Sequence, residues 1–536
     1  MKYMKDEILE SFKTKSSTNI QRILRKNNNI SLSDIILLYK KYCTEINIKE
    51  NREFIEKIKL KPIRTLSGVV PVTVLTKPFP CPGKCIFCPN DTQMPKSYLS
   101  KEPGAMRALM NKFDPYTQVK NRIQALQNIG HKTEKIELLI LGGTFSVYPR
   151  NYQEWFIKRC IEAMNNFQYE YSDKKFIKNE INFDVQTSQK DPPYNWNIKS
   201  LIDAQKINEN SNIRCIGITI ETRPDRISEN ETIHLRTLGA TKIQLGIQST
   251  NDEVLKANNR GEKSSNQKKA IAILRSAGFK IQIHWMPNLY KSTPKKDIKD
   301  IQNIYYNKSY MPDEIKIYPC SIIDETELFE YYKKGKYKPY SEKDLIDILI
   351  YAKKITPRYV RINRLIRDIP STYIEDGNKK TNLRQIVQNE MGKQNLFCQC
   401  IRCREIKNDP INKITYEQID YKTDTSLEKF LSFNTKDKIL GFLRLSLPDN
   451  RQSFIDELGE SSIIREVHVY GLSLGINDNN GGVQHLGIGK KLIKKAEEIS
   501  KEYNFKKISV ISGIGTREYY KKRGFIQGNL YQSKLI

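Results

Sequence analysis

Three cysteines in one short segment are the residues whose chemistry is clearest in this chain. Cys81, Cys85 and Cys88 stand at C-x3-C-x2-C spacing, directly after the apolar run over residues 69–75. Three thiolates on one loop can bind three irons of a cubane cluster, whereas such clusters normally take four cysteines. The fourth iron would then be open to another ligand. A disulfide with one free thiol, or a zinc knuckle, is the alternative interpretation.

A second group of cysteines stands later in the chain. Cys398, Cys400 and Cys403 form a C-x-C-x2-C pattern. Soft ligands this close together favour zinc, with a fourth ligand from elsewhere. We expect His131 to supply that ligand, and three unligated thiols are the alternative. Four ligands leave no open position, so we predict a structural zinc site that links two parts of the chain.

The chain is strongly basic. It has 536 residues, enough for two or three domains, and a formal net charge of +29. This excess favours a polyanionic partner, although a composition rich in Lys, Asn and Ile would also contribute lysines. No apolar run approaches the roughly 20 residues of a membrane span, and the first residues carry no signal sequence. Scattered cysteines suggest a reducing compartment, and we expect the cytoplasm.

Short apolar runs that alternate with helical stretches must position the first cysteine loop. This alternation is typical of parallel βα units, and six of them predict a partial (β/α)6 barrel with its active site at the carboxyl ends of the strands. The loop follows the first strand and so lies at that end. The expected strands cover residues 69–75, 136–141, 215–220, 242–247, 280–285 and 315–318.

Glycines and polar residues at the expected strand ends are candidates for cofactor contacts. Gly142 and Gly143 would let a ligand approach the backbone closely, or they form only a tight turn. Glu221 and Arg223 follow the third strand and are either ligand contacts or a structural ion pair. His284, in the fifth strand, is expected to be a satisfied barrel-end histidine.

A glycine-bearing turn indicates a separate α/β domain over residues 421–536. Gly487, Ile488, Gly489 and Lys490 precede an expected helix over residues 491–503. Free backbone N–H groups and the helix dipole at such a turn favour a phosphate. The pattern Q-x-x-G-x-G resembles the acetyl-CoA pyrophosphate loop of GNAT acetyltransferases, and no acidic residue follows at the distance typical of a dinucleotide fold.

Two further sites in this domain could take part in catalysis. Glu466 and His468 lie two apart on an expected strand and so share one face. Either could be a general base, or both are ordinary polar strand residues. Tyr519 and Tyr520 precede a Gly-Phe pair, and this is the usual ending of a GNAT domain.

The remaining segments complete a four-part organisation. Residues 1–60 are expected to form basic helices, either a solvated surface or an arm for RNA phosphates. The barrel is assigned to residues 61–340 and the zinc-binding linker to residues 341–420. Residues 166–212 interrupt the alternation and are interpreted as a surface insertion.

A three-cysteine loop, a zinc-type cluster and a GNAT domain in one chain resemble the family of Elongator catalytic subunits, the tRNA wobble-uridine acetyltransferases. These enzymes combine a radical S-adenosylmethionine barrel with a GNAT domain. The resemblance covers most of residues 60–536. It is carried by segments that include Gly142-Gly143-Thr144-Phe145, Glu221-Thr222-Arg223-Pro224-Asp225, Asn259-Arg260-Gly261 and Glu466-Val467-His468-Val469-Tyr470-Gly471.

The resemblance implies cofactors and residue roles. Cys81, Cys85 and Cys88 would hold a 4Fe-4S cluster, and S-adenosylmethionine would bind its open iron near Gly142 and Gly143. Acetyl-CoA would contact Lys135, Glu466, Val467, His468, Val469, Gly487, Ile488, Gly489, Lys490 and Tyr520. Glu466, Tyr519 and Tyr520 would take part in catalysis.

The implied reaction joins the two cofactor sites. A 5′-deoxyadenosyl radical would take hydrogen from the methyl group of acetyl-CoA, and the resulting carbon would add to carbon-5 of the wobble uridine in a tRNA anticodon loop. Thioester hydrolysis would leave a carboxymethyl group. Elongator-type subunits or a second copy are the protein partners considered. The alternatives are a protein lysine acetyltransferase with the barrel as scaffold, and a tRNA-binding subunit without activity.

Overall fold

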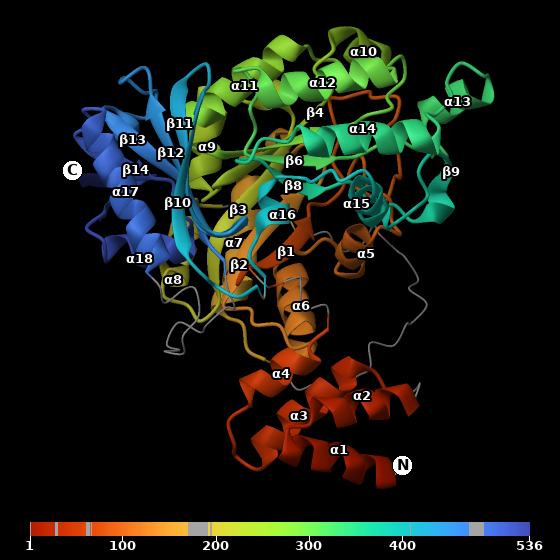
Figure 1. The fold of residues 1–536 in the computed structure, drawn as a ribbon, viewed down its shortest axis with the longest axis vertical. Helices are drawn as coiled ribbons and strands as arrows, with labels where there is room; N and C mark the ends of the chain where they lie inside the picture. The colour runs from red at the N-terminus through yellow and green to blue at the C-terminus, as the bar shows by residue number, and fades with distance from the viewer. Residues whose placement is uncertain are drawn as a thin grey trace.

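The computed structural model consists of an N-terminal group of helices, a half-barrel of parallel strands and a C-terminal sheet domain (Figure 1). It describes residues 2–26, 30–60, 65, 67–169, 191–192, 196–407, 409–470 and 487–536. None of the helices in these ranges has the length and hydropathy that crossing a membrane requires.

Seven parallel strands form the half-barrel, in the order β1-β2-β3-β4-β5-β6-β8. The strands are β1 Val70–Leu75, β2 Lys135–Leu141, β3 Arg214–Thr222, β4 Lys242–Gln248, β5 Lys280–Trp285, β6 Glu314–Ile317 and β8 Arg361–Arg364. The prediction of six strands is confirmed. The seventh, β8, was missed because its sequence R-I-N-R contains no apolar run.

Helices accompany this sheet, and among them α6, α7 and α11 contact its strands, whereas α13 packs on the short separate strand β7 Ile322–Ile323 (Figure 1). The helices are α5 Pro103–Met110, α6 Pro115–Asn128, α7 Arg150–Asn165, α8 Lys199–Asn208, α9 Glu229–Thr237, α10 Asp252–Ala257, α11 Ser264–Ser276, α12 Pro294–Tyr306, α13 Glu327–Lys333, α14 Glu342–Lys354 and α15 Leu383–Lys393. Helix α6 illustrates their local coding, because the Asp114 side chain accepts from the Thr117 N–H at 2.8 Å and Pro115 opens the first turn.

Helix α8 corrects the interpretation of residues 166–212 as a surface insertion. Its Leu201 is fully buried in the main core, and Asn208 donates to Asn165 at the end of α7 over 2.7 Å. The helix is therefore part of the half-barrel. Residues 170–190 and 193–195 of the expected insertion lie outside the described residues.

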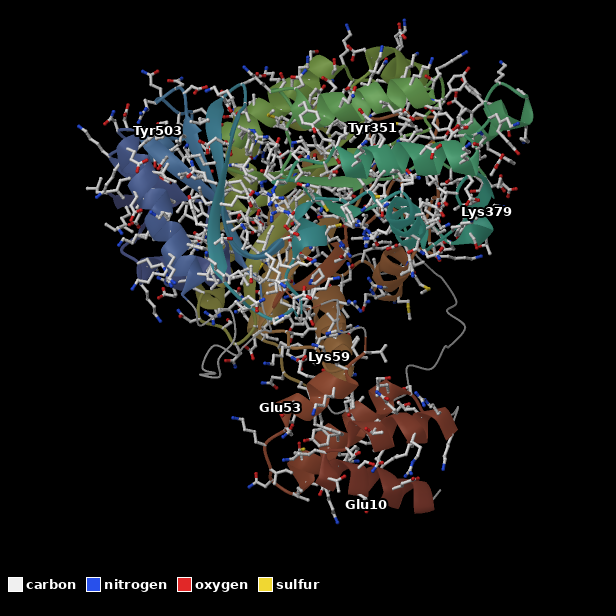
Figure 2. The ribbon with its side chains drawn as sticks, in the orientation of Figure 1. Glu10, Glu53, Lys59, Tyr351, Lys379 and Tyr503 are labelled. Atoms are coloured by element: carbon white, nitrogen blue, oxygen red, sulfur yellow. The ribbon has the colours of Figure 1, made fainter. Side chains whose placement is uncertain are left out.

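The N-terminal helices α1 Lys2–Thr14, α2 Ser17–Lys26, α3 Leu32–Glu45 and α4 Arg52–Ile58 enclose a core of their own. Within it, the rings of Tyr39 and Phe54 meet edge to face at 4.8 Å. The group contacts the half-barrel at α6, where Lys40 donates to the Gln127 carbonyl at 3.0 Å. Lys59 marks this junction in Figure 2. Because these helices have a small core of their own and contact the half-barrel at α6, they form a module attached to it.

The C-terminal domain is a seven-stranded sheet in the order β10-β11-β12-β13-β14-β16-β15. Its elements are β10 Ile414–Lys422, β11 Ser426–Thr435, β12 Lys438–Pro448, β13 Ser461–Val469, β14 Lys507–Val510, β15 Ile526–Gln527, β16 Gln532–Leu535, α17 Ile488–Glu502 and α18 Arg517–Lys521. The domain limits therefore move. β8 belongs to the half-barrel although it follows residue 340, and residue 420 lies inside β10.

The C-terminal domain packs against the starts of the barrel strands, and one continuous hydrophobic core spans both. Buried Arg236 on α9 donates to the carbonyls of Ser512 and Leu530 at 2.8 and 2.9 Å. Asp313, just before β6, accepts from Arg465 of β13 at 2.5 Å, with both side chains fully buried. These contacts fix the two parts as one body.

Replacing Gly513 by alanine should weaken this interface. A Cβ atom there would lie 2.1 Å from the carbonyl oxygen of Ile216 in β3, and backbone cannot move aside as a flexible side chain can. We expect the free energy of unfolding to fall by about 1–3 kcal/mol, as overpacking does. Gly392→Ala in α15 is the matched control, because its Cβ would meet nothing within 4 Å. Denaturant unfolding measures both, and equal stabilities would contradict the expectation.

Candidate functional site

One cavity of about 1040 Å³ connects the first cysteine loop with the C-terminal sheet through the interior of the half-barrel. Cys88 lines it beside the carboxyl ends of the barrel strands. Glu466, His468 and Tyr520 line it on the C-terminal domain. The sites that the sequence indicated separately therefore open into one space.

The cysteine loop does not have the compact spacing of a single-ion site. Cys81, Cys85 and Cys88 are all free thiols. Two sulfurs bound to one zinc ion lie at most about 4.6 Å apart, since each Zn–S bond is about 2.3 Å long. The three sulfur atoms of this loop do not form a group within 4.8 Å, although Cys398, Cys400 and Cys403 do. The wider set suits a cluster of several irons and argues against the zinc-knuckle and disulfide alternatives.

Backbone contacts hold this loop in place. The N–H of Ile86 donates to Asn258 at 3.2 Å, and the Ile86 carbonyl accepts from Leu328 at 2.9 Å. Cys81 Sγ lies 3.6 Å from the hydroxyl of Thr144, directly after the glycine pair. Loop and glycine pair thus meet at the ends of β1 and β2.

The backbone conformation and the close neighbours of Gly142 and Gly143, after β2, require glycine at both positions. Gly142 has φ +146° and Gly143 has φ +87°. A Cβ on Gly142 would lie 1.8 Å from the Thr76 hydroxyl oxygen, and one on Gly143 would lie 3.0 Å from the Lys96 carbonyl oxygen. Backbone without side chains therefore lies beside the cysteine loop, as the sequence predicted for a close approach of ligand.

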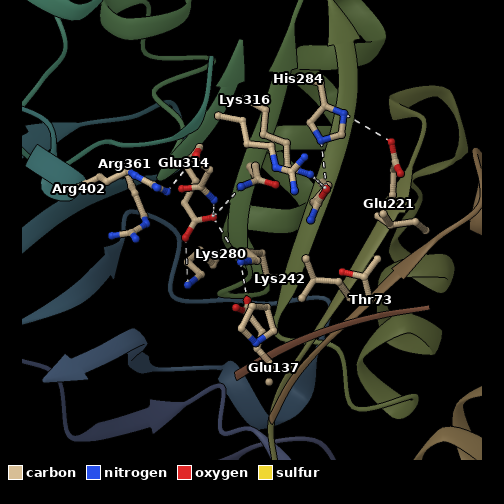
Figure 3. Close-up of a pocket in the computed structure, with 18 of the residues that line it drawn as sticks. Thr73, Glu137, Glu221, Lys242, Lys280, His284, Glu314, Lys316, Arg361 and Arg402 are labelled. Atoms are coloured by element: carbon tan, nitrogen blue, oxygen red, sulfur yellow. Dashed lines mark hydrogen bonds and ion pairs between the residues drawn. The ribbon is translucent and has the colours of Figure 1, made fainter. Parts of the chain in front are cut away.

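A layer of alternating charges crosses the interior of the half-barrel at the strand starts (Figure 3). Lys242 lies 2.5 Å from Glu137 and 3.3 Å from Glu314. Lys280 lies 3.3 Å from Glu314 and 2.6 Å from Glu466 of the C-terminal domain. Burial opposes ionisation of Glu314, but the two lysines lower its pKa well below its usual range. The layer stays charged and connects both domains.

A second polar group, which includes Glu221, His284 and Lys316, lies nearer the carboxyl ends of the strands (Figure 3). Lys316 donates to Gln244 at 2.6 Å, and His284 Nε2 lies 3.1 Å from the same oxygen. His284 Nδ1 faces Glu221 at 3.5 Å, and Tyr98 donates to Glu221 at 2.6 Å. Burial lowers the pKa of Lys316 to about 7. His284 is hydrogen-bonded as expected, while Glu221 lines the cavity.

The sequence interpretation named His284 and Glu221 but gave no role to Lys242 and Gln244 on β4, Lys280 on β5 or Glu314 on β6. A signal existed, because polar residues alternate with isoleucine in K-I-Q, K-I-Q-I-H and E-I-K-I. Alternation with period two places one set of side chains on one face of a strand. Here that face is the interior of the half-barrel.

An open strand edge lies on the C-terminal domain. Strands β13 and β14 pair in parallel only from Ser461↔Lys507 to Ile464↔Val510. Beyond Ile464, residues up to Val469 pair with β12 alone. Backbone groups at an edge where pairing stops can bind an extended ligand by strand addition. This edge contains Glu466, Val467, His468 and Val469, the residues for which acetyl-CoA contacts were expected.

The expected phosphate turn lies beside this edge. Gly487 has φ +65° and forms the N-cap of α17, while residues 471–486, including the first part of the glutamine–glycine pattern, lie outside the described residues. A Cβ on Gly489 would lie 2.6 Å from the Tyr519 hydroxyl and 3.6 Å from Val469. Tyr520 is buried against Tyr519 and Phe525. The structure thus brings the turn, the strand edge and the two tyrosines together.

Lys135 lies apart from this group. It begins β2 beside Arg214, close to where Gly515 contacts the barrel, and does not line the cavity. Burial lowers its pKa. Its place at the domain junction is compatible with contact to a distal part of a bound coenzyme.

Glu466 and His468 differ in their surroundings. The Glu466 carboxylate is 2.6 Å from Lys280 Nζ and accepts from Arg444 Nε at 2.9 Å. Burial would raise its pKa, but these two cations lower it to about 2. Among the described residues, His468 Nε2 has no hydrogen-bond partner. Burial lowers the pKa of His468, so the imidazole is neutral near pH 7.

The second cysteine group forms a compact site between the domains. Cys398, Cys400 and Cys403 have sulfur atoms within 4.8 Å of one another. Ile401 donates to Val360 beside β8, and Ile406 donates to Ile439 in β12, at 2.9 and 3.1 Å. The segment around α16 Ile401–Arg404 therefore links half-barrel and C-terminal domain, as predicted.

His131 is not the fourth ligand of this cysteine group. The group contains no histidine among the described residues. His131 is buried elsewhere, with Nδ1 2.9 Å from the Thr65 hydroxyl. The physical reason is topology, because His131 precedes β2 while the cysteines follow β8 at the other edge of the sheet. The fully buried Lys353 contacts the cysteine group, because its Nζ donates to Cys403 Sγ at 4.0 Å.

Arginines gather around the cavity near β8. Five of them line it: Arg361, Arg364, Arg367, Arg384 and Arg402. Arg361, Arg364 and Arg367 pair with carboxylates. Arg384 and Arg402 donate instead to backbone carbonyls, each at 3.1 Å. Their charges remain available to an anion that reaches this part of the cavity.

Comparisons with known proteins agree with this arrangement. Residues 80–301 match the radical SAM superfamily, residues 312–393 a radical SAM C-terminal domain, and residues 401–525 the acetyltransferase (GNAT) family. A tRNA uridine(34) acetyltransferase from Methanocaldococcus infernus is 41% identical, over 92% of this chain and 90% of that protein. The chain belongs to the tRNA uridine(34) acetyltransferase family.

Other members of the family confirm the extent of the match. Human Elongator complex protein 3 is 33% identical over 90% of this chain and 86% of its own length. The solved structure of "The archaeal Methanocaldococcus infernus Elp3 with N-terminus deletion (1-46)" has a TM-score of 0.72 and 38% identity, covering 88% of this chain and 99% of that one. The predicted half-barrel with a C-terminal GNAT domain is confirmed. Nothing in these comparisons favours the lysine acetyltransferase alternative.

Proposed function

We propose that this protein modifies carbon-5 of the wobble uridine in tRNA, using acetyl-CoA and S-adenosylmethionine. The observation that carries the proposal is the single cavity between the cysteine loop and the open edge of β13. A radical formed at one end can reach an acetyl group held at the other only if both ends share a space. The tRNA uridine(34) acetyltransferases of the family, 41% and 40% identical, support the choice of substrate.

In this proposal Cys81, Cys85 and Cys88 hold a 4Fe-4S cluster, and Gly142 and Gly143 let S-adenosylmethionine approach the backbone. The cluster with its bound S-adenosylmethionine supplies a carbon radical that can abstract a hydrogen atom. The interior of the half-barrel then has to exclude water and guide substrate. Its charge layer at the strand starts gives it polar walls without a free carboxylate.

The C-terminal domain holds acetyl-CoA in this proposal. The pantetheine amides bind the edge over Glu466, Val467, His468 and Val469, and the pyrophosphate binds at Gly487, Ile488, Gly489 and Lys490. Tyr520, which lines the cavity, borders the acetyl end, and Tyr519 lies against Gly489 of the pyrophosphate turn. The open pairing after Ile464 and the glycine N-cap of α17 support these assignments.

His468 is the general base in this proposal. It removes a proton from the water that hydrolyses the thioester, because the neutral imidazole lines the cavity and its Nε2 has no hydrogen-bond partner among the described residues. Glu466, an alternative base from the sequence, serves to orient Lys280, since two cations hold its carboxylate. Arg384 and Arg402 contact phosphates of the anticodon loop, whose unpaired bases can turn into a cavity.

Mass spectrometry of tRNA nucleosides tests the function. Anaerobic incubation of reduced, cluster-loaded protein with tRNA, S-adenosylmethionine and acetyl-CoA should yield a carboxymethylated uridine, and omission of either cofactor should prevent it. Unmodified uridine under fully reducing conditions would refute the proposal. A lysine acetyltransferase would instead acetylate a basic peptide without S-adenosylmethionine.

Zinc at the second cysteine group is also a proposal. We expect about one zinc per chain by elemental analysis, lost in Cys400→Ser. Hydrogen bonds from Cys398 and Cys403 lower the pKa of Cys400, which favours the thiolate form that binds a metal cation. Cys160→Ser, in the barrel core, is the control and should keep the metal. Full zinc occupancy in Cys400→Ser would contradict the assignment.

Acting on tRNA fits a cytoplasmic location and a basic surface, both expected from the sequence. The N-terminal helices, which carry Arg22, Arg25 and Lys26 on α2, are proposed to contact the tRNA body. Association with Elongator-type subunits or with a second copy stays a prediction.

A further inference from the structure

Two buried arginines lie directly beneath the first cysteine loop, and the reaction outlined above gives them no role. Arg260 Nη1 donates to Cys85 Sγ at 3.5 Å. Arg223 approaches the loop beside it, since a Cβ on Gly83 would lie 2.4 Å from Arg223 Nη1 and 3.7 Å from Cys81 Sγ. Only 5% of the Arg223 side chain and 7% of the Arg260 side chain are exposed.

Two carboxylates hold these arginines from the side away from the loop. Arg223 donates to both oxygens of Asp225, at 2.8 and 3.1 Å. Arg260 Nε lies 3.3 Å from Glu262, whose side chain is fully buried, and Arg223 Nη2 lies 3.6 Å from the same carboxylate. The four side chains are neutral in sum but oriented, with guanidinium groups toward the cysteines.

Two donors in this group have no hydrogen-bond partner among the described residues, Arg223 Nη1 and Arg260 Nε, and of the two Arg260 Nε has a carboxylate 3.3 Å away. Both nitrogens are buried. A buried N–H without an acceptor costs free energy unless a ligand supplies one. We take a sulfur atom at the loop as the acceptor for Arg223 Nη1, because a Cβ on Gly83 would lie 2.4 Å from this nitrogen and 3.7 Å from Cys81 Sγ.

We propose that Arg260 and Arg223 donate N–H···S hydrogen bonds to sulfur atoms at the cysteine loop and thereby raise the reduction potential of the iron–sulfur cluster. This inference rests on the proposed function, because that function requires the cluster. Reduction transfers one electron from an external one-electron reductant, such as dithionite, and makes the cluster one unit more negative. Hydrogen bonds and positive charge at the sulfurs stabilise that state, and cluster potentials depend on both.

The test is a redox titration of the reconstituted full-length protein without tRNA or acetyl-CoA. Electron paramagnetic resonance monitors the fraction of reduced cluster at each potential. Arg260→Met should lower the midpoint potential, by about 59 mV for each tenfold loss in the reduction equilibrium. Glu262→Gln should raise it, because the neutralising carboxylate is removed while the donors remain. Arg226→Met is the matched control, since the side chain of this neighbouring arginine is 41% exposed, pairs with Asp225 and forms no hydrogen bond to a cysteine among the described residues.

Iron and sulfide analysis of each variant separates the outcomes. A fully loaded Arg260→Met protein with the wild-type potential would overturn the inference. If that variant does not hold its cluster, Glu262→Gln decides, and an unchanged or lowered potential there would overturn it equally. Failure of the wild-type protein to assemble a cluster would instead refute the proposed function.

Discussion

Cys85→Ala should reduce formation of the modified uridine by at least about 1000-fold, since removal of one member of a catalytic unit disables the whole unit. Only three cysteines are available in the loop, so the variant leaves two ligands for a cluster that needs three. The protein should also lose its brown colour and its iron. Binding of tRNA, measured by a gel shift, should be unchanged, because the arginines near β8 and the N-terminal helices do not depend on the loop.

Cys43→Ala is the matched control for this prediction. Cys43 is buried in the separate core of the N-terminal helices. It should keep iron, colour and product. An active Cys85→Ala protein would show that the loop is not the cluster site, whereas loss of activity in both variants would point to damage of the fold.

His468→Ala should slow the tRNA-dependent hydrolysis of acetyl-CoA by about 10²- to 10⁴-fold, the usual contribution of a general base. Because burial lowers the pKa of His468, its neutral form persists below the ordinary histidine value of about 6.5. The wild-type rate should therefore stay level as the pH falls through 6.5 and should decline only at lower pH. The rate is measured by the appearance of the free thiol of coenzyme A as acetyl-CoA is hydrolysed.

Two controls define the role of this histidine. His234→Ala, on α9 and outside the cavity lining, should hydrolyse normally. Glu466→Gln should leave hydrolysis in the folded fraction but lower the free energy of unfolding by about 3–5 kcal/mol, since Lys280 and Arg444 lose a buried partner. The stabilisation by Glu466 is present above its unfolded pKa of about 4.3 and is lost as the pH falls toward 2. A wild-type rate in His468→Ala would exclude it as the base.

The sequence predicted those parts of the site that local patterns encode. Cysteine spacing, glycine pairs and apolar runs depend on neighbours in the chain, so the cysteine loop, Gly142, Gly143 and six barrel strands were found. β8 was not found, because a strand of Arg and Asn is stabilised by pairing with β6 and by charges in the cavity. Polar residues also alternate along β4 to β6, but recognising them as site residues required knowing that the interior of the half-barrel is a cavity and not an apolar core.

Long-range contacts account for the remaining differences. Glu466 and His468 looked equivalent on one strand face, and only Lys280 from β5 and Arg444 from β12 distinguish them. Likewise, His131 looked like a ligand in sequence, but the sheet order places it far from the second cysteine group. Lys280 and Glu466, for example, are 186 positions apart in the chain, so no local pattern could show that they pair.

The shared cavity also constrains the order of events during turnover. Within the part of the chain that the structure describes, one cavity joins the residues proposed to hold the acetyl group with those at the cysteine loop, so we expect acetyl-CoA and the uridine to occupy it together. We therefore expect no acyl-enzyme intermediate that outlives the departure of coenzyme A. The protein should therefore work through a ternary complex, and coenzyme A leaves only after the nucleoside has reacted.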